Sequence, residues 1–244
     1  MIGSIVHRIN ETDSSNNYAA NQLLTKRLTE GVVFIADSQI DGRGQASNRW
    51  ESEPGKNLTF SILLYPEFLA ISRQFELSKA ISLGVADYLN EHTDNVCIKW
   101  PNDIYLGKRK VAGILIENSI RIDKISSSIV GIGLNINQIQ FTSDAPNPVS
   151  LTQMTGEIYN LEESLSDLCL KIDSRYQQLR NAEFGQIDQD YTNSLYNLGI
   201  WSPYWDENGD FEGKLLGVDA IGRLLIETHS GRINKYQFKE VTFK

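Results

Sequence analysis

Residues 99–117 read Lys-Trp-Pro-Asn-Asp-Ile-Tyr-Leu-Gly-Lys-Arg-Lys-Val-Ala-Gly-Ile-Leu-Ile-Glu. Runs of β-forming residues separated by polar turns predict strands at 96–100, 103–107 and 110–118. Between Lys99 and Gly113 there are four basic residues and one acidic residue. Such an island of positive charge suits a polyphosphate ligand, although a solvated hairpin turn has the same composition.

Helical and extended patterns continue on both sides of this stretch. The apolar spacing predicts helices at 16–30, 73–91 and 161–181 and strands at 32–36, 58–64 and 127–136. The polar segment 37–57 lies between two of these strands and contains several glycines. Because long loops in compact domains are usually functional or mobile, this segment is a candidate for ligand binding.

The sequence pattern changes after about residue 197. Short β-forming runs at 213–219, 223–228, 234–238 and 241–243 are broken by glycine turns, which predicts the strands of a small barrel. We therefore expect two domains, at residues 1–197 and 198–244. Trp201 and Trp205 lie beside this boundary and are expected to pack the two domains together.

Composition excludes several classes of protein. The 244 residues carry 23 basic and 31 acidic side chains, a net charge of −8, which argues against a protein that mainly grips nucleic acid. Cys97 and Cys169 are far apart, so we expect neither a disulfide framework nor a cysteine-rich zinc site. No apolar run approaches the ~20 residues of a membrane helix, and no signal peptide pattern begins the chain. A cytoplasmic protein without membrane contact is expected.

Three groups of residues have the chemistry of a binding site. Arg43 lies between two glycines, where a guanidinium can meet a phosphate or carboxylate, although glycines often serve only a turn. Lys99 ends an apolar run; a desolvated lysine there needs an anion, unless the strand end is exposed. Asn135 ends the glycine-rich run that begins at Gly131 and can read a purine edge, or the run simply allows close strand packing.

Taken in order, these groups resemble the pattern of the biotin protein ligases. That pattern is a Ser/Thr-Asn pair before the first helix, a Gly-Arg-Gly loop ending in Trp, Lys-Trp-Pro-Asn-Asp, Lys-x-Ala-Gly-Ile-Leu-x-Glu and Gly-x-Gly-x-Asn. This chain has Ser14-Ser15-Asn16, Gly42-Arg43-Gly44 through Trp50, Lys99 to Asp103, Lys110 to Glu117, and Gly131 to Asn135. The resemblance runs from about residue 5 to the end. It implies an α+β fold, with a mixed-sheet catalytic domain and a small C-terminal SH3-like β-barrel.

The resemblance also implies an activity. Such ligases condense biotin and ATP, with Mg²⁺, to biotinyl-5′-AMP, and then modify a lysine of a biotin carboxyl carrier protein of acetyl-CoA carboxylase type. The alternatives are a lipoate/octanoate protein ligase or transferase, and a non-catalytic sensor of biotinyl-adenylate. Because the pocket residues begin at Ser14, no N-terminal DNA-binding domain and no DNA partner are expected. A homodimer through sheet edges is possible in such a fold.

Site residues follow from the same resemblance. The implied catalytic residues are Lys99 and Arg43. The implied biotin-binding residues are Ser14, Ser15, Asn16, Gln39, Arg43, Gly44, Gln45, Lys99 and Gly113. The implied adenylate-binding residues are Arg43, Gln45, Trp50, Lys99, Asn135 and Lys244. Asp103 is expected to support Lys99 or Mg²⁺.

One departure concerns the glycine loop. Gln45 stands where many relatives have a second arginine, which removes a cation near the phosphate. The adenylate is then held less tightly, or Arg49 or Lys56 takes that role. Residues 40–57 are expected to become ordered over the bound adenylate.

Overall fold

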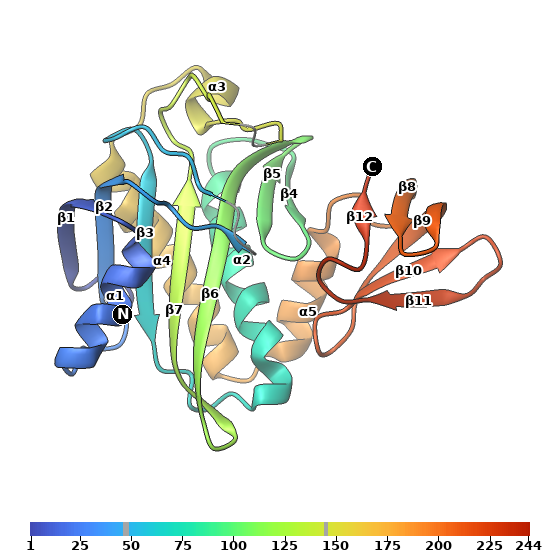
Figure 1. Cartoon of the computed structure of the whole chain (residues 1–244), viewed down its shortest axis with the longest axis horizontal. Coiled ribbons are helices and arrows are strands. Elements are labelled where there is room, and N and C mark those ends of the chain that lie inside the picture. Colours follow the sequence, from blue (N-terminus) through green and yellow to red (C-terminus); the bar gives the residue numbers. More distant parts are fainter. Residues whose placement is uncertain (46–48, 144–145) are drawn as a thin grey trace.

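A mixed seven-stranded sheet forms the larger part of the molecule (Figure 1). The computed structural model describes residues 1–45, 49–143 and 146–244, so part of the predicted 40–57 loop lies outside the described residues. The strands are β1 (Val6–Thr12), β2 (Val33–Gln39), β3 (Leu58–Leu64), β4 (Val96–Lys99), β5 (Asp103–Leu106), β6 (Arg109–Arg121) and β7 (Lys124–Leu134). Their order is β1-β2-β3-β7-β6-β5-β4, with β1 and β2 parallel and the other pairs antiparallel.

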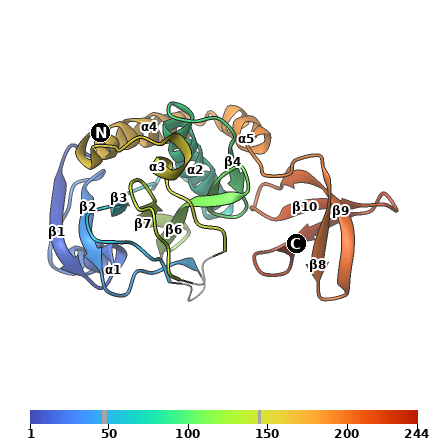
Figure 2. The ribbon, with the colours of Figure 1, turned by 90° about the horizontal axis from the view of Figure 1, so that it is seen from above.

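Alternation along the central strands gives the sheet two different faces. In β3, Phe60 and Ile62 point to the main apolar core, whereas Ser61 points to the opposite face. The core face is covered by α2 (Gln74–Asn90) and α4 (Leu161–Arg180). The short helix α1 (Ser15–Thr25) lies on the other face over a smaller apolar cluster, so the sheet is sandwiched only in part (Figure 2).

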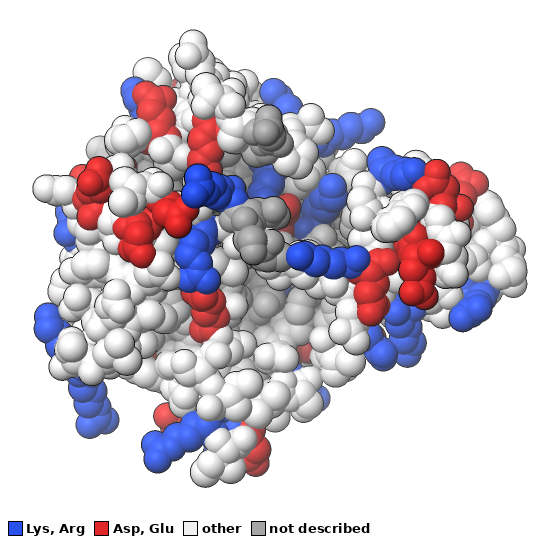
Figure 3. Space-filling model, viewed as in Figure 1, with Lys and Arg blue, Asp and Glu red and all other residues white. Residues whose placement is uncertain are grey.

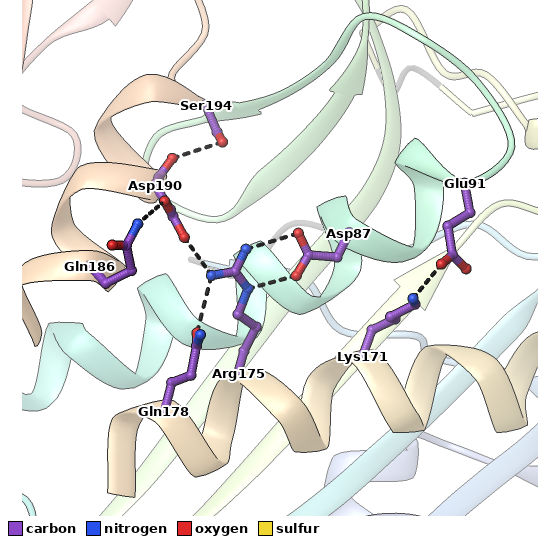
Figure 4. Close-up of polar contacts among 8 residues, drawn as sticks. All are labelled: Asp87, Glu91, Lys171, Arg175, Gln178, Gln186, Asp190 and Ser194. Carbon is purple, nitrogen blue, oxygen red and sulfur yellow. Dashed lines mark hydrogen bonds and ion pairs between the residues drawn. The ribbon is translucent and has the colours of Figure 1, made fainter. Parts of the chain in front are cut away.

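Ion pairs join the helices that cover the core face. Arg175 on α4 donates from Nε to Asp87 on α2 at 2.6 Å and from Nη1 to Asp190 on α5 (Phe184–Asn193), also at 2.6 Å (Figure 4). The Arg175 side chain is 15% exposed, and these carboxylates raise its pKa. One partly buried cation therefore connects three helices.

A second sheet follows α5 and is antiparallel throughout. Its strands are β8 (Trp201–Asp206), β9 (Gly209–Val218), β10 (Leu224–Thr228), β11 (Ile233–Tyr236) and β12 (Thr242–Phe243). Its order is β11-β10-β9-β8-β12, and within the described residues no pairing joins β11 to β12. The predicted α+β fold with a small C-terminal β unit is confirmed, and the strand pairings of the described residues make that unit an antiparallel sheet without a closing pair. The domain limits at 197 and 198 stay a prediction.

The two tryptophans near the boundary are exposed and not buried between the domains. Trp201 and Trp205 are 38% and 47% exposed, so the expectation that they pack the two domains together is wrong. The reason is the alternation of β8, which turns Ser202 and Tyr204 inward and both tryptophans outward. Trp201 instead stacks on His229, with ring centroids 3.9 Å apart.

Four further strands and α-helices were not expected, namely β1, β8, α3 (Leu151–Thr155) and α5. Strand β1 is a polar edge strand, and its mostly exposed side chains hide the two-residue period. Helices α5 and α3 are short, and α1 ends at Thr25 because Lys26 is extended. Among the residues described, no helix is long and apolar enough to span a membrane.

We expect Arg175→Met to lower the free energy of unfolding by about 3 kcal/mol, because the substitution leaves two partly buried carboxylates without their cation. Urea unfolding followed by circular dichroism measures this change. The matched control is Lys171→Met on the same helix. Lys171 pairs with Glu91 at the surface, where an ion pair contributes little to stability. The unfolding midpoint of the Lys171→Met variant should therefore match that of the wild type. Equal destabilisation by both substitutions would contradict the structural role of Arg175.

Candidate active site

A cavity lies on the face of the sheet that α2 and α4 leave uncovered, in the region where Figure 3 shows Lys and Arg side chains around a hollow. The start of α1, residues 39–45, Trp50 and strands β5, β6 and β7 enclose it. Its lining consists of Ser14, Ser15, Asn16, Gln39, Arg43, Gly44, Gln45, Trp50, Asn102, Asp103, Lys110, Gly113, Ile114, Leu115, Gly131, Ile132 and Gly133. Every residue predicted to contact biotin, except Lys99, is in this set.

Two glycines of β7 form the floor of the cavity. A Cβ atom on Gly131 would lie 2.4 Å from Oδ1 of Asn16, and one on Gly133 would lie 2.2 Å from the Trp50 indole. Both distances are shorter than any van der Waals contact, so only glycine lets these side chains rest on the sheet. With the indole in this position, the free volume is about 50 Å³.

Neutral hydrogen-bonding groups gather at the start of α1. Ser61 on β3 donates to Oδ1 of Asn16 at 2.6 Å, and its hydroxyl also bonds Oγ of Ser15 at 2.8 Å. The backbone N–H of Ser15 donates to Oε1 of Gln39 at 2.7 Å. Ser14, Ser15 and Asn16 are all buried. The network therefore holds several hydrogen-bond donors and acceptors in fixed positions at this end of the cavity.

Glu117 on β6 connects this network to the glycine loop. One of its carboxylate oxygens accepts from Asn16 at 2.8 Å, and the other accepts from Arg43, also at 2.8 Å. Arg43 donates in addition to Oδ1 of Asn17 at 2.6 Å. The guanidinium is thus held at the cavity, while about two-fifths of the Arg43 side chain remains exposed.

Lys110 on β6 provides a second cation. Its ammonium lies 2.7 Å from Oδ1 of Asp103 on β5 and 5.7 Å from the centre of the Trp50 ring. The Lys110 and Asp103 side chains are 23% and 24% exposed, so this pair is only partly screened by solvent. Lys110 and Arg43 both line the cavity, so one cation of the basic stretch and the arginine of the glycine loop belong to the site.

Lys99 lies outside the lining of this cavity. Its Nζ is 3.4 Å from the Tyr105 hydroxyl and 5.1 Å from the ring centres of Tyr105 and Phe243. Burial lowers the pKa of Lys99, and the nearby Asp103 opposes that shift. The side chain therefore occupies an aromatic pocket between β4 and the C-terminal sheet.

Two predicted adenylate residues also lie apart from the cavity lining. Asn135 is buried just beyond the end of β7, where its Nδ2 donates to the carbonyl of Val149 at 3.1 Å and its Oδ1 has no partner among the described residues. Lys244 pairs with Asp210 on the C-terminal sheet. Trp50, Arg43 and Gln45, by contrast, line the cavity, and their contact with an adenylate stays a prediction.

The described residues around the cavity do not bring together the side chains that usually bind a metal ion. The described parts of the chain contain no cluster of three or more His, Cys, Asp and Glu side chains. Asp103, the predicted metal ligand, already binds the ammonium of Lys110.

Sequence reasoning did not single out Ser61, Glu117 or Asn17 as site residues. Ser61 and Thr59 are the two polar residues of β3, and both lie on the face opposite the core. This alternation is the signal that could have found Ser61. Glu117 follows from the same rule, since it shares its face of β6 with Gly113 and Leu115. Nothing in the local sequence indicates the contact between Asn17 and Arg43.

Comparison with known proteins agrees with this geometry. Residues 8–135 match the Biotin/lipoate A/B protein ligase family. The Bifunctional ligase/repressor BirA of Bacillus subtilis is 33% identical over 226 residues, which cover 89% of this chain and 68% of that protein. The Biotin--[acetyl-CoA-carboxylase] ligase of Paracoccus denitrificans is 31% identical, over 91% and 93% of the two chains.

Solved structures extend the likeness to the whole chain. The biotin protein ligase from Aquifex aeolicus in complex with biotin and ATP superposes with a TM-score of 0.81 and 28% identity, covering 99% of both chains. Sequence, fold and the cavity thus agree, and the chain belongs to the biotin/lipoate A/B protein ligase family.

Proposed function

We propose that the chain is an ATP-dependent biotin protein ligase that forms biotinyl-5′-AMP and transfers biotin to a lysine of a biotin carboxyl carrier protein. The observation that carries the proposal is a single cavity in which a neutral hydrogen-bonding network and two cations meet. Biotin offers a neutral ureido ring and a carboxylate, and ATP offers phosphates, so this combination fits both substrates. The named relatives that cover most of the chain support it.

In this proposal the neutral network binds the ureido ring. Ser15, Asn16 and Gln39 supply hydroxyl and amide groups that are already oriented by Ser61 and Glu117. Preorganised groups lose little freedom when the ligand binds, which favours affinity and selectivity. Once the Trp50 indole leaves Gly133, the glycine floor has room for the ring to lie against the sheet.

The two cations stabilise the developing charge of the first half-reaction. A carboxylate oxygen of biotin attacks the α-phosphorus of ATP, the new O–P bond forms, and the bond to pyrophosphate breaks with its electron pair on pyrophosphate. Lys110 faces the cavity and Lys99 does not, so we assign charge neutralisation at the α-phosphate to Lys110 and place Arg43 over the adenylate. Asp103 orients Lys110 through their ion pair.

Trp50 has to move when the substrates bind. Ligand sites of this kind measure roughly 300–1,000 Å³, whereas the present cavity measures about 50 Å³. The indole occupies the space above Gly133, and its Nε1 is buried without a partner in the described structure. A buried donor without a partner destabilises this position by about 1–3 kcal/mol, so the indole is ready to leave.

The second half-reaction needs no covalent bond to the enzyme. The ε-amine of the carrier lysine attacks the carbonyl carbon of the mixed anhydride, the C–N bond forms, and AMP leaves with the electron pair of the broken C–O bond. The amine proton passes to solvent. The protein's task is to position the amine and to keep water from the anhydride. The two free cysteines and the use of ATP are consistent with a cytoplasmic enzyme. In this proposal the catalytic domain ends near residue 197.

Lys110→Met should slow biotin-dependent exchange of pyrophosphate into ATP by about 100-fold or more, because it removes a charge-stabilising group from the transition state. Lys99→Met is the matched control, since it removes an equally long cation that lies outside the cavity lining. It should change the exchange rate by less than about tenfold. The reverse order of the two effects would return the catalytic role to Lys99.

Lys99→Met should also change how stability depends on pH. Burial lowers the pKa of Lys99 in the folded state below its usual value of 10.5, so folding disfavours the charged form. The wild type is therefore less stable than Lys99→Met at pH 7, and it gains stability relative to the variant as pH rises through the folded-state pKa toward 10.5. Thermal unfolding of both proteins between pH 7 and pH 10 measures this. A constant difference across that range would contradict it.

Ser61→Ala should raise KM for biotin about fivefold and leave KM for ATP unchanged, because one hydrogen-bonding group worth about 1 kcal/mol no longer orients Asn16 and Ser15. Thr59→Val is the control on the same face of β3. Thr59 donates to the carbonyl of Ala36 and does not line the cavity, so its loss should lower stability without changing KM for biotin. Equal KM effects would show that Ser61 acts only through stability.

A further inference from the structure

A groove of about 400 Å³ lies beside the active-site cavity, between the two sheets. Helix α2 contributes Ser78 and Ser82, the turn before β5 contributes Trp100, and strand β6 contributes Ile116. The C-terminal part of the chain closes the other side with Gly222 and Phe238. Neither biotin nor ATP is assigned to this groove in the mechanism above.

The groove adjoins the cavity to which we assign adenylate formation. Gln45, Asn102, Ile114 and Leu115 line both spaces. A group that enters along the groove therefore reaches the cavity past the same side chains. Asn102 is fixed at this junction, since its Nδ2 donates to the carbonyl of Ile114 at 2.7 Å.

The charge of the groove does not suit the phosphates of a nucleotide. Arg223 is the one charged residue in its described lining, and Nε of Arg223 donates to Oδ2 of Asp219 at 2.8 Å. Pyrophosphate carries several negative charges, and the neighbouring cavity offers it two cations, Lys110 and Arg43, whereas the groove offers one. The occupant of the groove is therefore a neutral or largely apolar group.

Its surface has the features of a protein-binding site. Ile221 and Phe238 are 55% and 40% exposed at the groove, and exposed apolar side chains of this kind favour contact with another protein. Within the groove, Ser82 is 1% exposed and its hydroxyl has no partner among the described residues. A peptide backbone supplies the N–H and C=O groups that such a hydroxyl lacks.

The walls of the groove are fixed to each other. Nε1 of Trp100 donates to the carbonyl of Gly222 at 2.9 Å, and the Phe238 ring meets the Trp100 ring edge to face. These contacts join the turn of the first sheet to two loops of the C-terminal sheet. Both parts of the chain are thus needed to shape the groove.

We propose that this groove receives the acceptor-lysine segment of the carrier protein and guides its side chain into the cavity. The inference rests on the proposed function. The apolar stem of the lysine lies along the neutral groove, and its amine passes Asn102 to reach the carbonyl carbon of biotinyl-5′-AMP. The C–N bond then forms and AMP leaves, as in the second half-reaction above.

Two substitutions test the proposal. Ile221→Asp places a charge at the exposed edge, and Ser78→Trp fills the groove from α2. We expect each to lower kcat/KM for biotinylation of a purified biotin carboxyl carrier domain by at least about tenfold. Biotin-dependent pyrophosphate exchange should stay within twofold of the wild type. The control is Ile200→Asp, because Ile200 is 56% exposed and does not line the groove; it should leave both rates unchanged.

A small nucleophile separates access from chemistry. Hydroxylamine attacks the adenylate without a docking segment, so its hydroxamate should form at the wild-type rate in both groove variants. Wild-type transfer rates to the carrier in these variants would overturn the proposal. An equal fall in exchange and transfer would also overturn it, because the groove would then serve adenylate formation. A wild-type chain that shows no biotin-dependent exchange would instead overturn the proposed function itself.

Discussion

The site depends on the close contact between two side chains and the glycines of β7. Asn16 and Trp50 rest directly on Gly131 and Gly133, at distances that no Cβ atom would allow. The opposite face of the same strand carries Val130 and Ile132 into the main core. One strand therefore stabilises the fold with its large residues and opens the site with its small ones. Since the alternation is fixed by the geometry of a strand, a register shift of one residue would destroy both.

Two lysines of the basic stretch, Lys99 and Lys110, lie in different surroundings. Lys110 reaches the cavity and pairs with Asp103, whereas Lys99, at the end of β4, is enclosed by aromatic rings. Register explains the difference: Lys99 pairs with Asp103 across β4 and β5, while Gly113 faces Asp103 from β6, and Lys110 lies three residues before that glycine. The irregular register between Ile104 and Tyr105 brings Lys110 to its position.

Much of this arrangement could be predicted from the sequence. The long apolar periods indicate α2 and α4, and the ordered motifs indicate the family and most of the cavity lining. What could not be predicted depends on tertiary contact. The exposed strand β1 has no apolar period, the orientation of Trp201 depends on the register of β8, and the choice between Lys99 and Lys110 depends on a sheet irregularity.

The carboxylate of Glu117 has a consequence for selectivity. Arg43 already has a counter-ion at 2.8 Å, so any anion that approaches it must compete with a resident partner that Asn16 also holds. Free phosphate or sulfate offers only its charge and gains little from such an exchange. A ligand that simultaneously fills the glycine floor gains apolar contact as well, and it alone has enough binding energy to displace Glu117. An acidic residue can in this way protect an anion site from the common anions of the cell.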